Sequence, residues 1–346
     1  SSYFSNLQNW ENADPATRGN KPSIPQVGYI YPVLYRENMV VRTGMYTAAI
    51  KIYIRNTWDW LEVDLRKSDV DYIYRHCQYY KECVPTLQRR GKEWFLDFSF
   101  QTVMKLPEID ITQQRILSVD LGINSACTCS VMDAKGTILA RKFLRLPREY
   151  DSLAHAISHI KHAQKLGNRK MPKLWAQAKG INKDISVKTA EFIVNTAILY
   201  NVDCIVMEHL DLVKKKRGSK KQKLHMWRAK YVQAMVTDKA HRNFIRISRI
   251  CAWGTSKLAF DGSGLVQRGK SAELPTYSLC RFASGKQYNC DLNASYNIGA
   301  RYFIRELLKT LPETAEQAAT ANVPELAHRS TCTLSSLIRL HAELAA

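Results

Sequence analysis

The chain has 346 residues, of which 45% are hydrophobic, so it is long enough for two or three domains with sizeable cores. Its formal net charge of +20 favours a polyanionic partner, above all nucleic acid, over a merely basic surface. No run of 18 apolar residues or signal-peptide pattern is found, so we expect neither a membrane span nor secretion. The odd number of nine cysteines, several in apolar runs, predicts reduced thiols in a cytoplasmic setting.

The N-terminal third divides into two parts. Residues 1–26 are polar and rich in Asn, Ser and Pro, which predicts an irregular or truncated segment. Residues 27–114 are typical of a mainly-β domain with one helix near 69–80. Aromatic residues close together in one predicted strand, such as Trp94 and Phe98, favour a small barrel-like arrangement over other α+β folds. The expected strands are 29–35, 48–54, 60–63 and 93–100.

From residue 115 the pattern changes to a three-stranded meander followed by helices. Helical patterns cover 150–179, with a break at Pro172, and 185–200, and a further strand follows at 204–208. The expected meander strands are 116–120, 126–132 and 137–144. This βββαβ order predicts an α/β RNase H-like sheet.

The C-terminal part alternates regular and irregular segments. An irregular stretch at 251–275 precedes a hairpin that ends at Cys290, and residues beyond Pro312 form a helical tail. The other expected elements are a helix at 231–242, a strand at 244–250 and a helix at 292–308.

Three acidic residues occupy the ends of these elements. Asp120 and Glu208 end apolar strands, and Asp291 begins a helix. Taken singly, a turn or an N-cap explains each of them. Together they can meet at one edge of a sheet, where they would repel each other unless a cation neutralises them. Oxygen ligands suit Mg²⁺ or Mn²⁺, and this is the arrangement expected of a two-metal nuclease. In this order and context, the three acids resemble those of the split RuvC-like nuclease domain.

A dense basic block follows the strand that carries Glu208. Nine of the nineteen residues 212–230 are Lys or Arg. Beside a candidate nuclease strand, such a block favours a phosphate-contacting loop over a solvated surface. The residues predicted to bind nucleic acid are Lys214, Lys215, Lys216, Arg217, Lys220, Lys221 and Lys223.

With these segments in view, the chain resembles the TnpB family, transposon-encoded RNA-guided DNA endonucleases also known as OrfB-type transposases and related to type V CRISPR effector nucleases. Val-Asp-Leu-Gly-Ile-Asn at 119–124 and Ile-Val-Met-Glu-His-Leu at 205–210 carry the resemblance. So do Asp-Leu-Asn-Ala-Ser-Tyr-Asn-Ile at 291–298, the most specific of these motifs, and Thr-Ser-Lys at 255–257.

The resemblance implies that Asp120, Glu208 and Asp291 are catalytic and bind two Mg²⁺ (or Mn²⁺) ions. It implies a guide RNA from the transposon end and double-stranded target DNA as partners. The setting would be the prokaryotic cytoplasm, at the nucleoid. Residues 27–114 would be a wedge domain, 115–250 and 291–308 the split nuclease, 251–290 a target-loading insert and 309–346 a helical tail.

Two departures from the family pattern matter. Thr-Ser-Lys is followed by Leu258 rather than a Cys-x-x-Cys pair, and the chain contains no such pair, so we expect a degenerate zinc-ribbon-like insert without zinc. The room before residue 27 is too short for the family's recognition lobe. Two explanations for the missing lobe are open: the chain is truncated at its N-terminus, or its recognition segment is reduced. The first residue is Ser and not Met, which fits a truncated chain.

Two questions stay open at this level. Asn293 and Asn297 are expected either to support Asp291 or to act as local caps. The alternatives to an active guided endonuclease are a cleavage-inactive RNA-guided DNA-binding protein and a guide-independent RNase H-fold nuclease. Retention of all three acids favours activity, and the long basic insertion favours the guided class.

Overall fold

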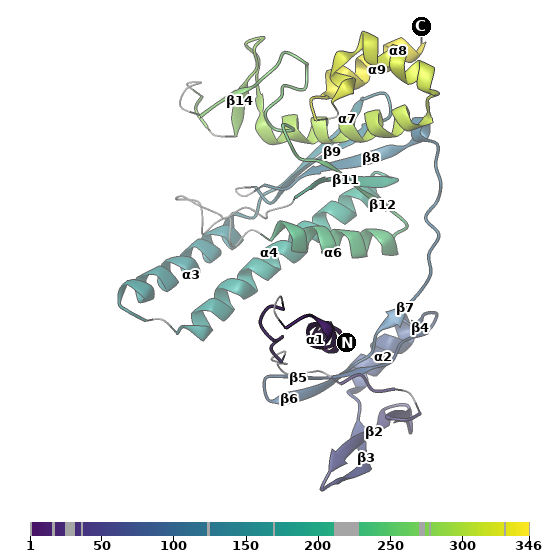
Figure 1. Ribbon diagram of the computed structural model, residues 1–346. Helices are drawn as coiled ribbons and strands as arrows, with labels where there is room; N and C mark the ends of the chain where they lie inside the picture. Colours follow the sequence, from purple (N-terminus) through teal and green to yellow (C-terminus); the bar gives the residue numbers. More distant parts are fainter. Residues whose placement is uncertain are drawn as a thin grey trace. The chain divides into compact units, whose positions relative to one another are not determined.

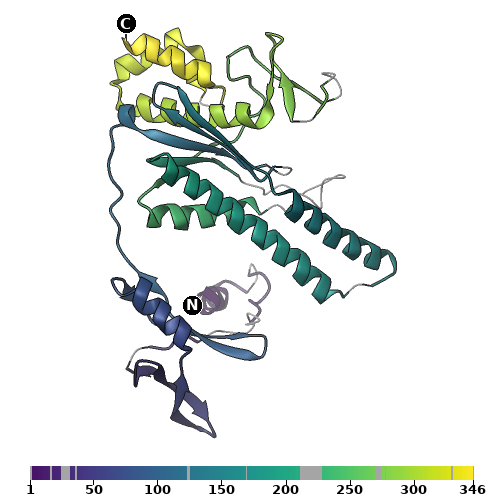
Figure 2. The same ribbon diagram turned by 180° about the vertical axis from the view of Figure 1, so that it is seen from behind.

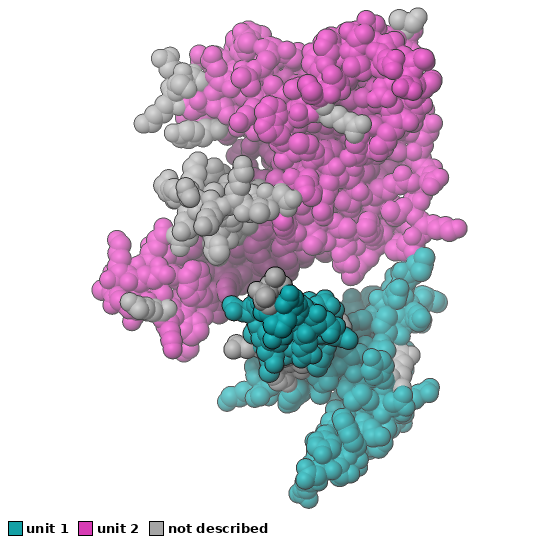
Figure 3. Space-filling view, viewed as in Figure 1, with its two compact units in different colours: residues 1–103 teal, residues 104–346 magenta. Residues whose placement is uncertain are grey.

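The structure of the protein is a computed structural model. It divides into two compact units, Ser1–Val103 and Met104–Ala346 (Figure 3). No helix in the described part of the chain is long and apolar enough to cross a membrane. The structure describes residues 2–15, 18–24, 32–35, 37–122, 125–168, 170–210, 228–269, 274–276, 278–328 and 330–345.

The first unit begins with helix α1 (Ser2–Asn12), where the sequence predicted an irregular segment. The indole of Trp10 explains the difference, because it anchors the helix to the segment that follows. Its Nε1 donates to the carbonyl of Gly19 at 2.6 Å, and the guanidinium of Arg18 lies 4.2 Å from the ring centroid. Composition alone does not reveal such a contact.

The strands of the first unit form small separate sheets. The largest is a three-stranded sheet whose hairpin turns through Arg55 and Asn56, both with positive φ. Helix α2 (Lys67–His76) follows this hairpin, close to the predicted helix. The strands are β1 (Val40–Arg42), β2 (Thr47–Ile54), β3 (Thr57–Asp64), β4 (Lys81–Glu82), β5 (Thr86–Arg90), β6 (Glu93–Asp97) and β7 (Phe100–Gln101).

Among the described residues these strands do not close into a barrel, so the barrel-like prediction is wrong there. Beside the three-stranded sheet there are two separate two-stranded sheets, β4 with β7 and β5 with β6, and Thr86 of β5 also forms a single bridge with Val33. Several of the strands are too short to close a barrel, and aromatic side chains of the three-stranded sheet point to solvent. Several strands have two or three residues, and Trp58 and Trp60 are exposed instead of filling a barrel interior. The small core gathers around Leu34, Val40 and Ile50.

The second unit is built on a five-stranded mixed sheet in the order β10-β9-β8-β11-β12. The first three strands are antiparallel neighbours, and β11 and β12 run parallel to β8. This confirms the predicted βββαβ order and the RNase H-like sheet. The strands are β8 (Arg115–Asp120), β9 (Cys127–Asp133), β10 (Ile138–Leu144), β11 (Cys204–His209) and β12 (Arg246–Cys251).

Helices cover both faces of this sheet (Figures 1 and 2). Helix α7 (Cys290–Thr310) lies on one face, and α4 (Pro172–Leu199) and α6 (Ala229–Arg242) lie on the other. The period-two alternation of the strands divides the core accordingly. Ile116, Cys204 and Val206 pack in the cluster that contains α7, and their neighbours Leu117, Ile205 and Met207 pack in the cluster with α4 and α6.

Helices α3 (Pro147–Lys165) and α4 form a hairpin that extends beyond the sheet (Figure 1). The sequence predicted that Pro172 interrupts one long helix and that a second helix begins near residue 185. Instead Pro172 is the first residue of α4, a position that tolerates proline because its missing N–H would have no partner in the helix. The hairpin has its own core, which includes Leu153, Ile160 and Ile185.

The insert and the tail complete the second unit. The insert contains β13 (Gln267–Arg268), β14 (Leu279–Arg281) and β15 (Gln287–Asn289), which include the predicted hairpin. Phe282 and Phe260 pack in its apolar core, so apolar contacts hold its shape; the absence of zinc remains a prediction. Helices α8 (Glu313–Asn322) and α9 (Leu334–Ala345) cover α7 on the side away from the sheet (Figure 1).

Candidate functional site

Asp120 and Glu208 lie side by side on one face of the central sheet. The parallel pairing of β8 and β11 joins Val119 to Met207, so the next residues, Asp120 and Glu208, occupy equivalent positions. Val119 and Met207 point toward α4 and α6, as their core cluster shows. Because side chains alternate along a strand, Asp120 and Glu208 point to the opposite face, which α7 covers.

Asp291 is the second residue of α7 and lies over that same face. The side chain of Asn289 caps the helix by accepting hydrogen bonds from the backbone N–H groups of Asp291 and Leu292 at 3.0 and 2.9 Å. A carboxylate in the first turn is also favoured by the helix dipole. The hydroxyl of Ser125, in the loop after β8, donates to Asp291 Oδ2 at 2.9 Å. The loop of the first motif therefore holds the carboxylate of the third.

A stripe of α7 residues four apart sets the register of this helix on β8 and β9. Asp291, Ser295 and Gly299 share one side of the helix. Ser130 Oγ donates to Ser295 Oγ at 2.9 Å and lies 2.8 Å from Ser118 Oγ. One turn further on, a Cβ atom on Gly299 would lie 3.1 Å from the side chain of Met132. Four residues of a helix rise about 6 Å along its axis, and two residues of a strand rise about 6.8 Å. Successive residues of this stripe therefore lie over successive residue pairs of the two strands.

This register carries Asp291 toward Asp120. Ser118 and Ser130 form a cross-strand pair, and the next pair on the same face, two residues along, is Asp120 and Thr128. Ser295 lies over the first pair, as its hydrogen bond to Ser130 shows. Asp291, one turn before Ser295, therefore lies over the second pair. The elements β8, β11 and α7 thus bring the three predicted acids to one end of the two interior strands β8 and β11.

The surroundings of Asp120 and Glu208 oppose negative charge on their carboxyl groups. Burial raises the pKa of the Asp120 carboxyl well above its usual range, and repulsion from Glu208 and Asp291 raises it further. Burial also raises the pKa of Glu208, against the effect of a hydrogen bond from Thr255 and of the charge of Arg301. The surroundings therefore disfavour the ionised forms of Asp120 and Glu208, because neighbouring cations do not fully offset burial and repulsion.

A second stripe of α7 holds the segment after β12. Asn293 and Asn297 are completely buried and lie four residues apart. Asn297 Nδ2 donates to the carbonyls of Thr255 and Leu258, each at 2.9 Å, and Asn293 Nδ2 donates to Leu258 O at 2.8 Å. None of these three hydrogen bonds goes to Asp291 or to the backbone of α7, so the expectation that the two asparagines support that acid or cap the helix locally is wrong. They fix the segment that contains Thr255.

Thr255 is a site residue whose role sequence reasoning missed. Its buried hydroxyl donates to Glu208 Oε1, and Gln233 Nε2 of α6 donates to the backbone carbonyl of Glu208 at 2.7 Å. The signal was present in the Thr-Ser-Lys motif at 255–257. Hydrogen bonds therefore connect the second and third motifs through Thr255, which donates to Glu208 and accepts from Asn297 through its backbone carbonyl.

Arg301 continues this stripe as a buried cation. It is 4% exposed, and its guanidinium donates to the carbonyls of Cys251, Trp253, Ser330 and Cys332. Burial lowers the pKa of Arg301, and its charge helps to keep Glu208 ionised. The residue joins the segment after β12 to the segment that precedes α9.

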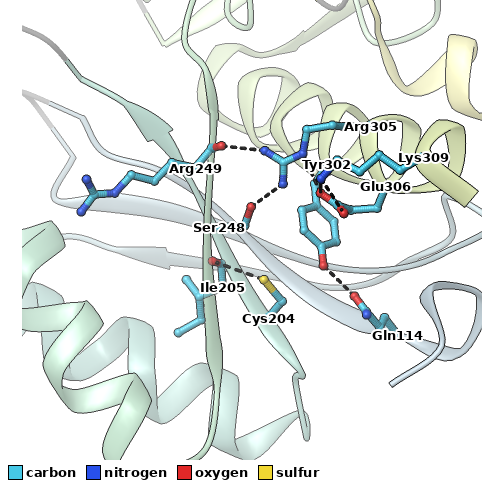
Figure 4. A network of polar contacts seen from close by, with 9 residues as sticks. All are labelled: Gln114, Cys204, Ile205, Ser248, Arg249, Tyr302, Arg305, Glu306 and Lys309. Carbon is cyan, nitrogen blue, oxygen red and sulfur yellow. Dashed lines mark hydrogen bonds and ion pairs between the residues drawn. The ribbon is translucent and has the colours of Figure 1, made fainter. Parts of the chain in front are cut away.

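The other end of α7 is fixed separately (Figure 4). Tyr302 Oη donates to Gln114 Oε1 at 2.7 Å, just before β8. Arg305 donates to Ser248 Oγ at 2.6 Å and to the carbonyl of Arg249 at 2.9 Å, both in β12. Cys204 lies beneath this network and is completely enclosed by it and the sheet. The helix that carries Asp291 is therefore held at both ends.

The residues that could hold a cation are the three acids. Within the described ranges, no three His, Cys, Asp or Glu side chains as they stand are grouped closely enough to hold a metal ion. The chemistry of the three carboxylates nevertheless fits Mg²⁺ or Mn²⁺, because all donors are oxygens and their charge is undercompensated.

The predicted basic residues from Lys214 to Lys223 lie outside the described residues.

A second basic surface, which sequence reasoning missed, lies at the end of the α3–α4 hairpin. Residues 161–183 contain seven Lys and Arg and no Asp or Glu. The described lysines are exposed: Lys161, Lys165, Lys170, Lys173, Lys179 and Lys183. Counting both signs of charge along the sequence could have found this surface.

Comparison with known proteins gives limited matches. The Aq_aa04 family model matches residues 1–54. No match was found among curated proteins. Among solved structures, a Cas12f1–sgRNA–target DNA complex shares 16% identity with a TM-score of 0.43, over 85% of this chain and 74% of that one.

Two further solved structures are similar at lower identity or coverage. Alicyclobacillus acidoterrestris C2c1 in complex with single-guide RNA shares 11% identity with a TM-score of 0.46, over 81% of this chain and 55% of that one. Thermus thermophilus RuvC shares 10% identity with a TM-score of 0.26, over 67% of this chain and 95% of that one. The RNase H-like assignment rests on the strand order and directions of the sheet itself.

Proposed function

We propose that the protein is a transposon-associated, RNA-guided DNA endonuclease of the TnpB kind, in which Asp120, Glu208 and Asp291 form the hydrolytic site. The observation that supports the proposal is the position of Asp120 and Glu208 at matching ends of β8 and β11, on the face that α7 covers. Burial raises the pKa of Asp120, and repulsion from Glu208 and from Asp291 of α7 raises it further. An undercompensated carboxylate cluster at a sheet edge is suited to phosphodiester hydrolysis with divalent cations.

Each neighbouring residue has a definite task in this proposal. Asp120, Glu208 and Asp291 would hold two Mg²⁺ or Mn²⁺ ions, which when bound supply an activated water and stabilise the leaving 3′ oxygen. Thr255 orients the carboxylate of Glu208, and Ser125 orients that of Asp291. The neighbouring Ser118, Thr128 and Ser130 are completely buried, and the low polarity of a buried site would strengthen the attraction of the carboxylates to a cation.

The charge distribution supports nucleic acid as the partner. The second unit contains 38 basic and 20 acidic residues, whereas the first contains 13 and 11. The basic end of the α3–α4 hairpin and the block from Lys214 to Lys223 are the densest parts of this excess. We infer that they contact the phosphates of a guide RNA and of target DNA. Residues 251–290 would then load the target strand, and residues 27–114 would act as the wedge.

The test is Mg²⁺-dependent DNA cleavage by the complete reading frame, co-expressed with the RNA that flanks its gene. We expect guided cutting by the wild type and a loss of about 10³-fold in Asp120→Ala and Asp291→Asn, because each removes a metal ligand. Both variants should still copurify with RNA. Cutting without RNA would indicate a guide-independent nuclease, and RNA and DNA binding without cutting would indicate a guided binding protein. A cutting Asp291→Asn variant would refute the assignment of the acids.

A further inference from the structure

A buried hydroxyl group beside Asp120 has no hydrogen-bond partner. Thr128 of β9 is completely buried, and its Oγ1 makes no hydrogen bond. In the described part of the chain, the only other buried side-chain polar atom in this condition is Ser263 Oγ. Burying a hydroxyl without a partner costs stability, and valine would fill the same volume without that cost.

The sheet register fixes the position of this hydroxyl. Thr128 is directly opposite Asp120 in the antiparallel pair of β8 and β9, so the two side chains share a face. The Cβ atoms of directly opposed residues lie about 4.5–5.5 Å apart, within reach of a hydrogen bond after rotation about χ1. The first turn of α7, with Asp291, covers this pair.

The other two acids already receive a hydroxyl hydrogen bond. Thr255 donates to Glu208, and Ser125 donates to Asp291. Among the described residues, no donor is seen on the carboxylate of Asp120. The unpartnered hydroxyl of Thr128 therefore lies beside the one acid that lacks such a bond.

We propose that Thr128 is the positioning residue of Asp120: its Oγ1 donates to the Asp120 carboxylate when the three acids converge on a divalent cation. The inference rests on the proposed nuclease site and adds a residue to it. The hydrogen bond would hold one carboxylate oxygen and leave the other directed at the cation. The cost of the unpartnered hydroxyl in the metal-free protein is then offset when the site is loaded.

Mn²⁺ binding to the full chain tests this without measuring cleavage. Free Mn²⁺ is followed by electron paramagnetic resonance during titration of the wild type, Thr128→Val and Thr128→Ser. We expect Thr128→Val to weaken Mn²⁺ binding about tenfold, the usual effect of losing a hydrogen bond to a metal ligand. Thr128→Ser keeps the hydroxyl and should bind within about twofold of the wild type.

Thermal unfolding separates this role from a packing role. In EDTA, Thr128→Val should melt at the same temperature as the wild type or higher, because it removes an unpartnered hydroxyl. Thr189→Val is the matched control: Thr189 is a buried threonine of α4, on the other face of the sheet, whose hydroxyl donates to Ile185 O at 2.7 Å. It should melt lower and bind Mn²⁺ as the wild type does.

The outcomes are distinct. Equal Mn²⁺ affinity in Thr128→Val and the wild type overturns the role of Thr128 and leaves the nuclease site standing. Equal weakening in Thr128→Ser and Thr128→Val assigns the effect to the lost methyl group and also overturns it. If Asp120→Ala binds Mn²⁺ as the wild type does, the metal site itself is wrong, and the inference falls with it.

Discussion

At the scale of the residue, the environment of Asp120 opposes its charge. Burial and the neighbouring acids raise its pKa in the folded state above the value of about 3.9 in the unfolded chain. Between these two values the folded state binds more protons than the unfolded state. The free energy of unfolding of the metal-free protein therefore falls as the pH rises through this range. Ionisation of Asp120 therefore lowers the stability of the metal-free protein.

We therefore expect Asp120→Asn to melt a few degrees higher than the wild type at pH 7 in EDTA, although it should not cleave DNA. The difference should shrink as the pH falls and disappear below about pH 3, where the carboxyl is protonated in both the folded and the unfolded state. Calorimetry from about pH 2.5 to about pH 8 measures this. Asp238→Asn, at an exposed ion pair of α6, is the control and should change the melting temperature by less than about 1 °C. A lower melting temperature for Asp120→Asn at pH 7 would contradict the account.

Arg301 shows the opposite case, a buried charge that is fully hydrogen-bonded. Its guanidinium serves carbonyls on two separate segments, which lysine cannot reach together because it has a single ammonium group. We expect Arg301→Lys to lower the free energy of unfolding by about 3 kcal/mol in urea denaturation. Arg242→Lys, at a surface ion pair, should change it by less than about 0.5 kcal/mol. Equal effects of the two changes would mean that the carbonyl contacts contribute little.

At the scale of the element, α7 determines whether the three motifs meet. Its close approach to β8 and β9 favours glycine at position 299, since an added Cβ would lie 3.1–3.2 Å from the side chains of Met132 and Ser118, which are both completely buried and would have to shift. We expect Gly299→Ala to lower the free energy of unfolding by about 1 kcal/mol and to reduce cleavage, because α7 and Asp291 are displaced together. Gly180→Ala in α4 meets nothing within 4 Å and should instead stabilise the protein by about 0.5–1 kcal/mol. If both changes stabilise the protein in urea denaturation, the space between α7 and the strands β8 and β9 accommodates a methyl group, and the prediction is wrong.

At the scale of the whole molecule, the charge is concentrated in the second unit, and its hairpin offers a described basic surface. Changing Lys173, Lys179 and Lys183 together to Gln should reduce the slope of log affinity against log salt by about 2–3 for nucleic acid, if each contacts a phosphate. Lys188, on the same helix, is already paired with Glu149 and Asp184 at 2.7 and 2.8 Å. Lys188→Gln is therefore the control and should leave the slope unchanged. An unchanged slope in the triple variant would make the end of the hairpin a solvated surface.

The sequence by itself determined the elements of the second unit and which of them carry acids. The apolar runs at 116–119 and 204–207 and the apolar periodicity of the helices are local signals that survive folding. They predicted the βββαβ order and the strand-end positions of Asp120 and Glu208. The catalytic roles of these acids remain predictions, and the basic block from Lys214 to Lys223 lies outside the described residues.

Only the tertiary structure decided the contacts between residues far apart in the chain. The partners of Asn293, Asn297 and Thr255 depend on how α7 crosses the segment after β12, and no periodicity encodes that crossing. The same holds for Thr128, which reads as an ordinary strand residue until the register sets it opposite Asp120. In the first unit, short strands and exposed tryptophans carried too little burial signal to specify how they pair. Local sequence fixes dihedral preference and the buried face, whereas pairing and docking depend on long-range packing free energy that no short window of sequence contains.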